Sequence, residues 1–258
     1  MKRTLVGRTI LVTRPAEQAA PLVRELERRG ARVLVAPTIR LMPARSAALT
    51  AALKELAAGR FDWITLTSAA TVEVLRERLA SPRGVRANVA VIGEGTAAAF
   101  RRWAHRDPDM QPTTFTTAGL ARAFPRGAGR VLCARADIAP EGLEDALARK
   151  GWEAVRVEAY RTVFATSLPR EAREALGRGE VDAVTFTSAS TVRGFVNARG
   201  GEEIRGSSGG PPKVVCIGPV TASAARDAGL RPAAVAKPHT LGGLVAALER
   251  TLPSSGRS

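Results

Sequence analysis

The chain has 258 residues, 45% of them hydrophobic, which fits two globular domains that each bury their own core. No apolar run approaches the roughly 18 residues of a membrane-spanning helix, and the first residues lead at once into an expected strand instead of the apolar core of a signal peptide. These features argue against an integral membrane protein. We expect a cytoplasmic protein with no membrane partner.

The formal net charge of +15 would suit a nucleic-acid-binding protein. The excess is nearly all arginine, however, and it is spread along the expected helices without forming a tail or a block. Aromatic residues make up 4% of the chain, which leaves few rings to stack on bases. We therefore expect no nucleic-acid partner. Two interpretations of the arginines stay open: solvated helix faces, or a cationic cleft for an acidic small molecule.

Cysteine and histidine are too sparse to predict a metal site or thiol catalysis. Cys133 and Cys216 fall inside apolar strands without metal-ligand spacing, and the histidines are His105 and His239. We expect neither a bound metal nor a cofactor.

Strand and helix signals alternate along the chain, which predicts parallel sheets covered by helices on both faces. Helical periodicity follows the first strand from Ala19 to Arg29, with Gly30 as the helix end. A matching helix runs from Pro140 to Lys150 and ends at Gly151. Apolar runs predict strands, in chain order, at 9–13, 31–37, 63–67, 88–93, 130–134, 154–160, 183–187 and 213–218.

An extended stretch follows the second strand of each half, at 36–44 and at 157–165. Pro37 and Pro43 argue against a helix in the first, and β-branched residues favour a strand in the second. We interpret both stretches as passes between two domains. Residues 200–212, rich in Gly, Ser and Pro, predict a mobile surface loop.

The chain repeats itself with an offset of about 120 residues. The segment FDWITLTSAATVEVL from Phe61 returns as VDAVTFTSASTVRGF from Val181, and TILVTR from Thr9 returns as RVLCAR from Arg130. A third match relates VAVIGEGTAAAF, from Val89, to a later segment, VVCIGPVTASAA. Three colinear matches indicate two copies of one α/β unit, and a site shared between similar halves is the natural functional hypothesis.

The two copies agree best where strands end and helices begin. In open α/β sheets these carboxyl ends face the ligand, and the helix start presents free N–H groups with partial positive charge. Up to six such starts would face one cleft if the two domains face each other. The candidate residues are Ser68, Gly93, Thr96 and Thr116 in one half and Ser188, Gly218, Thr221 and Thr240 in the other.

Each of these motifs also has a purely structural interpretation. A Ser or Thr at a helix start commonly serves only as a cap, which stabilises the helix by roughly 1 kcal/mol. The glycine turns lack the full dinucleotide-binding fingerprint, and the sequence has no nucleophile elbow and no P-loop lysine. Asp62 and Asp182 match each other but begin strands, so we interpret them as structural. Such a chain suits a reactive substrate that needs mainly folding and steering.

Five segments together resemble the uroporphyrinogen-III synthase family, over about Thr9 to Leu248. They are VTRP at 12–15, VEAYRT at 157–162, FTSAS at 186–190, CIGPVTA at 216–222 and HTLGGL at 239–244. No single motif is decisive, but their order and spacing are specific. The family cyclises the linear tetrapyrrole hydroxymethylbilane to uroporphyrinogen III, inverting ring D through a spiro intermediate with loss of water, in tetrapyrrole biosynthesis. The resemblance thus implies a lyase that needs neither metal nor cofactor. We also expect a monomer.

The resemblance also implies the fold: two similar parallel-sheet, flavodoxin-like domains with a chain crossover. Residues 1–36 and 165–258 would form one domain and residues 45–156 the other, joined by a two-stranded β linker at 37–44 and 157–164. These are the two extended stretches noted above. The substrate carries eight carboxylates, which agrees with a site made of helix N-termini and arginines.

Several residues match positions to which the family gives a role. Tyr160, the single tyrosine, matches the family's candidate proton donor to the departing hydroxyl, and with an ordinary pKa of about 10 it would be protonated at neutral pH. Its alternative role is an amphipathic residue on a linker strand. Arg14 matches the basic residue of the VTRP motif, and the repeat makes Arg135 its companion. The resemblance also implies substrate contacts for the threonines 96, 221 and 240 and the serines 68 and 188.

Two rival functions stay open. A hinged, two-lobed protein that binds an anionic small molecule without turnover would explain the duplication equally well. A nucleic-acid-binding module is motivated only by charge, and a steep salt dependence of binding would support it.

Overall fold

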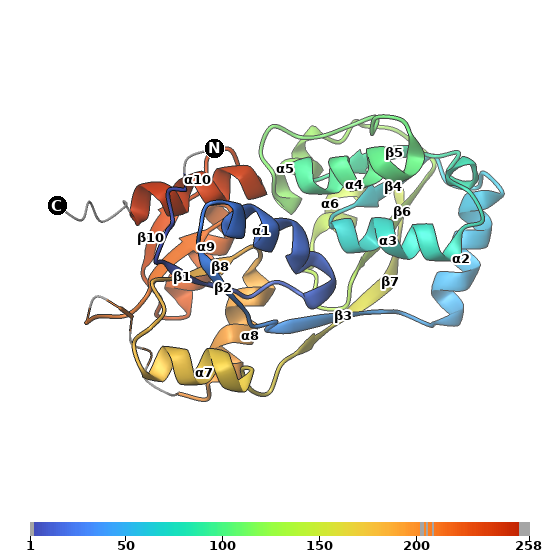
Figure 1. Cartoon of the computed structure of the whole chain (residues 1–258). Helices are drawn as coiled ribbons and strands as arrows, with labels where there is room; N and C mark the ends of the chain where they lie inside the picture. Colours follow the sequence, from blue (N-terminus) through green and yellow to red (C-terminus); the bar gives the residue numbers. More distant parts are fainter. Residues whose placement is uncertain (1–2, 202–203, 205, 208, 253–258) are drawn as a thin grey trace. The chain divides into compact units, whose positions relative to one another are not determined.

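The computed structural model describes residues 3–201, 204, 206, 207 and 209–252 and confirms the predicted α/β class, with two five-stranded sheets (Figure 1). The chain divides into two compact units: unit 1 comprises Met1–Arg40 and Val163–Ser258, and unit 2 comprises Leu41–Thr162. The predicted domain bounds, 1–36 with 165–258 and 45–156, refer to parts of the chain that fold independently. A division into compact units does not test that property, so these bounds stay a prediction.

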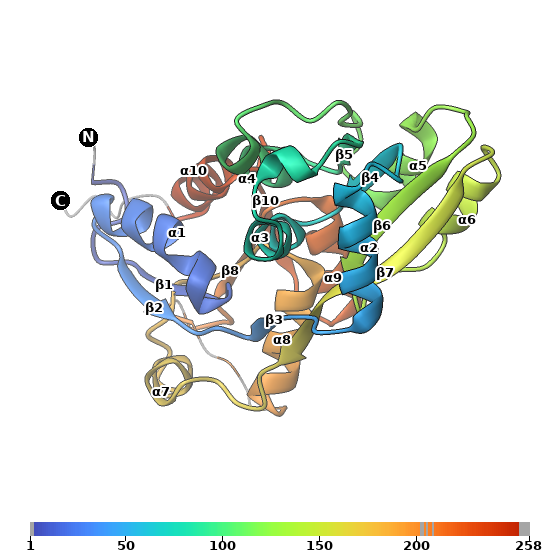
Figure 2. The same ribbon diagram turned by 90° about the vertical axis from the view of Figure 1, so that its right-hand side faces the viewer.

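Unit 1 is built on a sheet of strand order β10-β9-β8-β1-β2, with parallel pairing throughout (Figure 2). Its strands are β1 (Thr9–Val12), β2 (Arg32–Val35), β8 (Ala183–Phe186), β9 (Lys213–Cys216) and β10 (Pro232–Val235). Its helices are α1 (Ala16–Arg28), α7 (Arg170–Gly177), α8 (Ala189–Arg199), α9 (Pro219–Asp227) and α10 (Leu241–Thr251). Helices α7, α8 and α9 bury one sheet face, and α1 and α10 bury the other.

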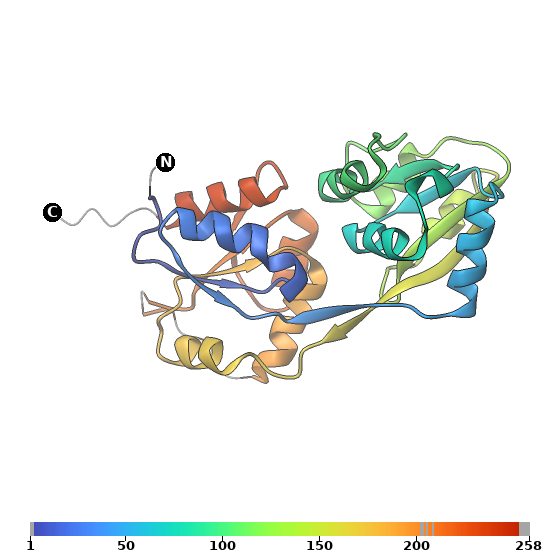
Figure 3. The same ribbon diagram turned by 45° about the vertical axis from the view of Figure 1, so that its right-hand side comes forward.

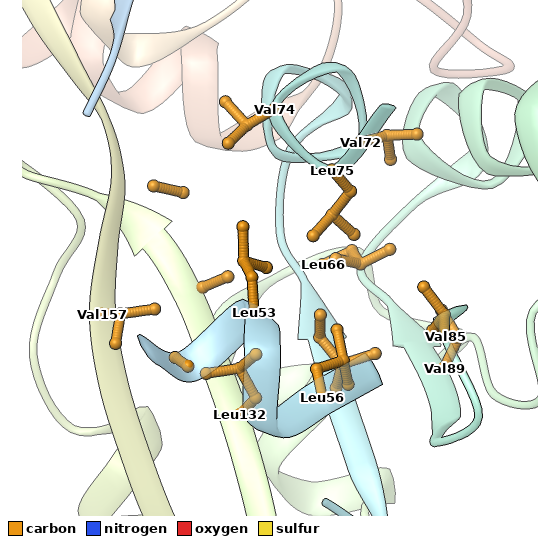
Figure 4. Close-up of a cluster of buried hydrophobic side chains, with 14 of the residues drawn as sticks. Leu53, Leu56, Leu66, Val72, Val74, Leu75, Val85, Val89, Leu132 and Val157 are labelled. Atoms are coloured by element: carbon orange, nitrogen blue, oxygen red, sulfur yellow. The ribbon is translucent and has the colours of Figure 1, made fainter. Parts of the chain in front are cut away.

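Unit 2 has the strand order β3-β7-β6-β4-β5. Its strands are β3 (Ile39–Pro43), β4 (Trp63–Leu66), β5 (Asn88–Val91), β6 (Arg130–Ala136) and β7 (Glu153–Phe164). Its helices are α2 (Ala47–Ala57), α3 (Ala69–Arg78), α4 (Glu94–Ala104), α5 (Thr117–Ala123) and α6 (Leu143–Ala148), with a short 3-10 turn at Pro82–Gly84. Helices α2, α3 and α4 cover one face, where Leu53, Leu75 and Leu132 lie in a single apolar cluster (Figure 4). Helices α5 and α6 cover the other face.

The second extended stretch is not a separate element. Residues 157–164 continue β7 as one strand of 12 residues, whereas β3 forms the first stretch (Figure 3). The Ala44 amide donates to the Ala159 carbonyl at 2.9 Å, and the Ala165 amide donates to the Thr38 carbonyl at 2.9 Å. Because residue numbers rise along one strand and fall along the other, β3 and β7 run antiparallel.

The repeat is visible in local structure. Gly30 and Gly151 follow helices α1 and α6 with φ of 86° and 99°, a left-handed conformation that glycine adopts without strain. Asp62 accepts a hydrogen bond from the Arg130 amide, and Asp182 accepts one from the Thr9 amide, both at 2.8 Å. The predicted structural role of the two aspartates is confirmed, since each ties adjacent strands together at the amino edge of its sheet.

Two predictions about local structure need comment. Strand β10 was not predicted, because its PAAV sequence is poor in β-branched residues. Residues 202, 203, 205 and 208 of the predicted 200–212 loop lie outside the described residues. Of the others, Gly206 forms an isolated bridge with Val181, and Ser207 donates to Asp182 at 2.6 Å. Among the described residues, no helix is both long enough and apolar enough to cross a membrane.

Candidate active-site residues of the two units

The carboxyl edge of the unit 2 sheet brings the predicted residues Ser68 and Tyr160 together. Ser68 ends the β4 segment and caps α3, its Oγ accepting from the Ala70 amide at 3.0 Å. The Ser68 hydroxyl also acts on the phenol of Tyr160, whose pKa it lowers. The fold therefore brings a strand-end serine near the family's candidate acid, although the two are far apart in the sequence.

Burial dominates the environment of Tyr160. Its side chain is 8% exposed and belongs to the apolar cluster of unit 2, and this desolvation raises the pKa of the phenol above its ordinary value. The negative charge of Asp137 raises the pKa further, whereas the Ser68 hydrogen bond and the charge of Arg135 lower it. The phenol is therefore protonated at neutral pH and can act as a proton donor.

Arg135, the predicted companion of Arg14, is almost fully buried at the end of β6. Its Nη1 donates to both carboxylate oxygens of Glu144 at 3.1 Å, and Arg156 approaches the same carboxylate at 3.9 Å. The Nε of Arg135 has no hydrogen-bond partner among the described residues. Glu144 already holds this cation, so a substrate contact for Arg135 stays a prediction.

Arg14 follows β1 at the carboxyl edge of the unit 1 sheet. It is partly buried, and this desolvation lowers the pKa of its guanidinium, which nevertheless stays charged. Its Nη2 donates to Gln18 at 3.2 Å, and its Nε has no partner among the residues that the structure describes. Helix α1 begins just beyond it at Pro15, without a side-chain cap. The first N–H groups of α1 and the positive charge of Arg14 thus suit a carboxylate.

Glycine turns begin corresponding helices in the two units. Gly93 precedes α4 and lies against the ring of Phe115, and Gly218 precedes α9 and lies against the ring of His239. Neither helix start has a side-chain cap. The Thr96 amide donates to the Gly93 carbonyl at 3.0 Å, and α9 begins with Pro219, which has no N–H. The other N–H groups of each first turn suit water or an anionic ligand. The predicted residues Thr96 and Thr221 are buried in the first turns of these helices, at 8% and 4% exposed.

Thr116 and Thr240 cap α5 and α10 in the same way. Their Oγ1 atoms accept from the amides of Gly119 at 2.9 Å and Gly243 at 3.1 Å. A Cβ added at Gly119 would lie 2.0 Å from the Thr114 carbonyl oxygen, and one at Gly243 would lie 1.9 Å from the corresponding oxygen of Pro238. These glycines are required because the helix start packs directly on the preceding turn.

Ser188 is the counterpart of Ser68, and its hydrogen bonds are local. Its Oγ accepts from the Thr191 amide at 3.1 Å, and its own amide donates to the Thr191 hydroxyl at 3.2 Å. The Thr191 carbonyl accepts from the buried hydroxyl of Thr38 at 2.9 Å. The sequence therefore predicted the location of this cap, and its reciprocal bonding is a structural finding.

The described residues contain no group of three or more His, Cys, Asp or Glu side chains that could hold a metal ion. Both cysteines are buried. Burial raises the pKa of Cys133 to about 11 and that of Cys216 to about 12, so neither thiol forms the reactive thiolate at neutral pH.

Some residues of these sites were not predicted: Asp137, Glu144, Phe115 and His239. The repeat contained a signal for two of them, because Phe115 and His239 each directly precede a matched threonine cap. Glu144 and Asp137 had no such signal, since their partners come from elements that only the fold brings together.

A family model for uroporphyrinogen-III synthase HemD matches residues 20–246. The chain belongs to the uroporphyrinogen-III synthase family. A uroporphyrinogen-III synthase of Synechococcus elongatus is 31% identical over 96% of this chain and 97% of its own length. A porphyrin biosynthesis protein HemD of Ruminiclostridium josui is 30% identical to this chain. The matched region covers 90% of this chain and 46% of that protein.

Solved structures of uroporphyrinogen III synthases share the fold. A mutant from the extremely thermophilic bacterium Thermus thermophilus is 24% identical with a TM-score of 0.67, covering 95% of this chain and 98% of that one. The structure from Helicobacter pylori is 18% identical with a TM-score of 0.60, covering 93% and 97%. The predicted family and two-sheet fold are confirmed.

Proposed function

We propose that this chain is a uroporphyrinogen-III synthase that closes hydroxymethylbilane to uroporphyrinogen III with inversion of ring D. The family match over residues 20–246 carries the proposal. In the proposed reaction the hydroxymethyl C–O bond breaks and the hydroxyl leaves as water. A carbon of ring D then forms the new bond to the resulting carbocation, and the spiro intermediate rearranges to the inverted product. The enzyme is accordingly a lyase of tetrapyrrole biosynthesis.

Tyr160 is the proposed proton donor to the leaving hydroxyl. Its raised pKa keeps the phenol protonated, and the Ser68 hydroxyl, which lowers that pKa, stabilises the phenolate that forms. Proton transfer leaves a transient phenolate, and a ring proton lost later in the reaction restores the phenol. No net proton is consumed.

Carboxylate recognition is proposed for the helix starts of both units. The uncapped N-termini of α4 and α9, at Gly93 and Gly218, offer backbone N–H groups, and Arg14 contributes a positive charge at the start of α1. A substrate with many carboxylates can use several such weak sites at once. We further propose that the enzyme is a cytoplasmic monomer that needs no metal or cofactor.

The test is the identity of the product. The chain is incubated with freshly prepared hydroxymethylbilane, and the isomers are separated after oxidation. Spontaneous closure gives isomer I, whereas the proposed enzyme gives isomer III. Isomer I at the spontaneous rate, together with saturable binding of the substrate, would instead identify a hinged binding protein. Isomer III should still form after dialysis against a strong chelator; loss of activity that zinc or magnesium restores would refute the metal-free proposal.

A further inference from the structure

Tyr160 lies on the opposite face of β7 from the one that simple alternation of side chains predicts. Side chains alternate along a strand, so Val157 and Ala159 share one face and residue 160 should point to the other. Yet Val157, Ala159 and Tyr160 all belong to the same apolar cluster of unit 2. The pairing of β6 with β7 explains this, because its register shifts between Arg135 and Ala136. The irregularity is a bulge that turns the phenol toward the start of α3.

Asp137 makes two hydrogen bonds to β7 directly after this bulge. Its backbone amide donates to the Tyr160 carbonyl at 3.0 Å, which continues the ladder one step beyond β6. The next ladder bond would run from the Thr162 amide to the backbone carbonyl of Asp137. Instead, the Asp137 side chain takes that bond through Oδ1 at 3.0 Å. One residue thus fixes the backbone of β7 at the Tyr160 carbonyl and again at the Thr162 amide.

We propose that Asp137 is a positioning residue for the reaction: its two hydrogen bonds to β7 keep the bulge in place and so hold the Tyr160 phenol against Ser68. This inference rests on the proposed role of Tyr160. Asp137 itself is exposed and bonds backbone rather than the phenol, so it acts through the tyrosine. An error of about 1 Å in the position of a catalytic group can cost roughly 100-fold in rate.

The chain provides an unusually direct readout, because Tyr160 is its single tyrosine. In protein labelled with ¹³C at tyrosine Cζ, one resonance reports the position and titration of this phenol without any substrate. The charged groups that act on the phenol are Asp137 and Arg135, and both are fixed on the same strand segment. The resonance therefore reports the position of the phenol independently of the rate of the reaction.

The experiment compares Asp137→Ala with Asp137→Asn. The alanine variant loses the acceptor for the Thr162 amide, whereas the asparagine variant keeps an oxygen there and loses only the charge. Asp62→Ala is the matched control, since it removes an aspartate acceptor from a strand amide at the opposite edge of the same sheet. For each variant, kcat and KM for isomer III formation, the tyrosine resonance and the thermal unfolding midpoint are measured.

We expect Asp137→Ala to lower kcat by about 10 to 100-fold, with KM within about 2-fold. Its tyrosine resonance should shift, and the phenol pKa should fall toward its ordinary value of about 10. Asp137→Asn should stay within about 3-fold of the parent kcat with an unmoved resonance at neutral pH. Asp62→Ala should change stability without moving the resonance.

Three outcomes would overturn the proposal: an unmoved tyrosine resonance in Asp137→Ala, a moved resonance with full kcat, or equal loss of kcat in the alanine and asparagine variants. If Asp137→Ala does not fold, Asp137→Glu, which displaces the acceptor by one methylene, is judged by the same criteria. Failure of the proposed function is distinct, because the unaltered chain would then give isomer I at the spontaneous rate. Failure of the proposed role of Tyr160 would appear as full activity in Tyr160→Phe, while the resonance of Asp137→Ala still reports positioning.

Discussion

The two strand-end serines carry nearly the same sequence and make different connections. Ser188 closes a reciprocal capping box with Thr191, so its hydrogen bonds stay within the first turn of α8. Ser68 caps α3 through Ala70 and also acts on the pKa of the Tyr160 phenol, which comes from a strand far along the chain. In unit 1 the first turn of α8 is instead bonded by Thr38, whose hydroxyl donates to the Thr191 carbonyl.

This difference shows how a duplicated unit becomes specialised. The shared motif fixes a hydroxyl at each helix start, because both sheets need a capped helix there. What lies near the hydroxyl depends on the neighbouring segment of the chain. In unit 2 this segment is β7, with its bulge and Tyr160, and in unit 1 it is the stretch before β3, with the buried Thr38. We therefore expect proton transfer to depend on unit 2, and both units to contribute to binding.

Replacing Tyr160 should have the largest effect on this comparison. Tyr160→Phe should lower kcat for isomer III by roughly 10 to 1000-fold, because general acid catalysis is lost and water substitutes only in part. The affinity for uroporphyrinogen III should change by less than about 3-fold. Stopped assays of isomer formation and equilibrium titration with the product give the two quantities.

The matched controls for this variant are Thr96→Val and Thr221→Val, one in each unit. Each removes a hydroxyl near a helix start and leaves the backbone N–H groups in place, so each should act more mildly than Tyr160→Phe. If Tyr160→Phe keeps full activity while a threonine variant loses it, the proton must come from a substrate carboxyl group or from water.

Alanine at Gly119 and Gly243 tests whether the helix starts of α5 and α10 both need a glycine, although the residues around them differ. Gly119→Ala and Gly243→Ala should each lower the free energy of unfolding by about 1–3 kcal/mol, since the new Cβ meets a carbonyl oxygen at 2.0 or 1.9 Å. Chemical denaturation of both variants measures the effect. A tolerated alanine in one unit would show that its turn relaxes and that the repeat is only superficial there.

The smallest effects should come from the two serines, and they should differ in kind. Ser188→Ala should cost about 1 kcal/mol of stability as a lost cap, with no change in the titration of the tyrosine. Ser68→Ala should cost a similar amount of stability and raise the pKa of Tyr160 further, because the Ser68 hydrogen bond is an interaction that lowers it.

The sign of the pH dependence follows from that raised pKa. A phenol that binds its proton more tightly when folded contributes stability below about pH 10, its unfolded pKa, and this stability is lost as the pH rises through the folded pKa. In Ser68→Ala the loss should extend to higher pH than in the parent. Tyrosine absorbance during alkaline titration is the measurement, and an unchanged curve would argue against the Ser68 contact.

The sequence predicted the fold well because the fold is encoded locally and twice. Alternating apolar strands and periodic helices set the class, and the repeat located the helix starts at Ser68 and Ser188. Strand β10 escaped prediction because PAAV is stabilised by its neighbours in the sheet more than by its own propensity. The family resemblance, more than any pattern, singled out Tyr160.

The side-chain partners could not be predicted. Whether Tyr160 faces Ser68 depends on a register shift that alternation alone predicts wrongly. Likewise, nothing near Arg135 in the sequence indicates that Glu144 would bind it with both oxygens, because that pairing needs the packing of α6 against β6. Long-range polar contacts of this kind are set by tertiary geometry, so they appear only in the folded structure.

The burial of both thiols has a practical consequence. Cys133 and Cys216 are shielded and protonated at neutral pH, so the natural chain already serves as a background that thiol-reactive probes leave untouched. A cysteine introduced at an exposed position in each unit, such as Arg170 and Asp107, would carry the only dyes or spin labels. Pairs of such labels would report the separation of the two units in solution, with and without tetrapyrrole. Neither buried cysteine would have to be replaced first.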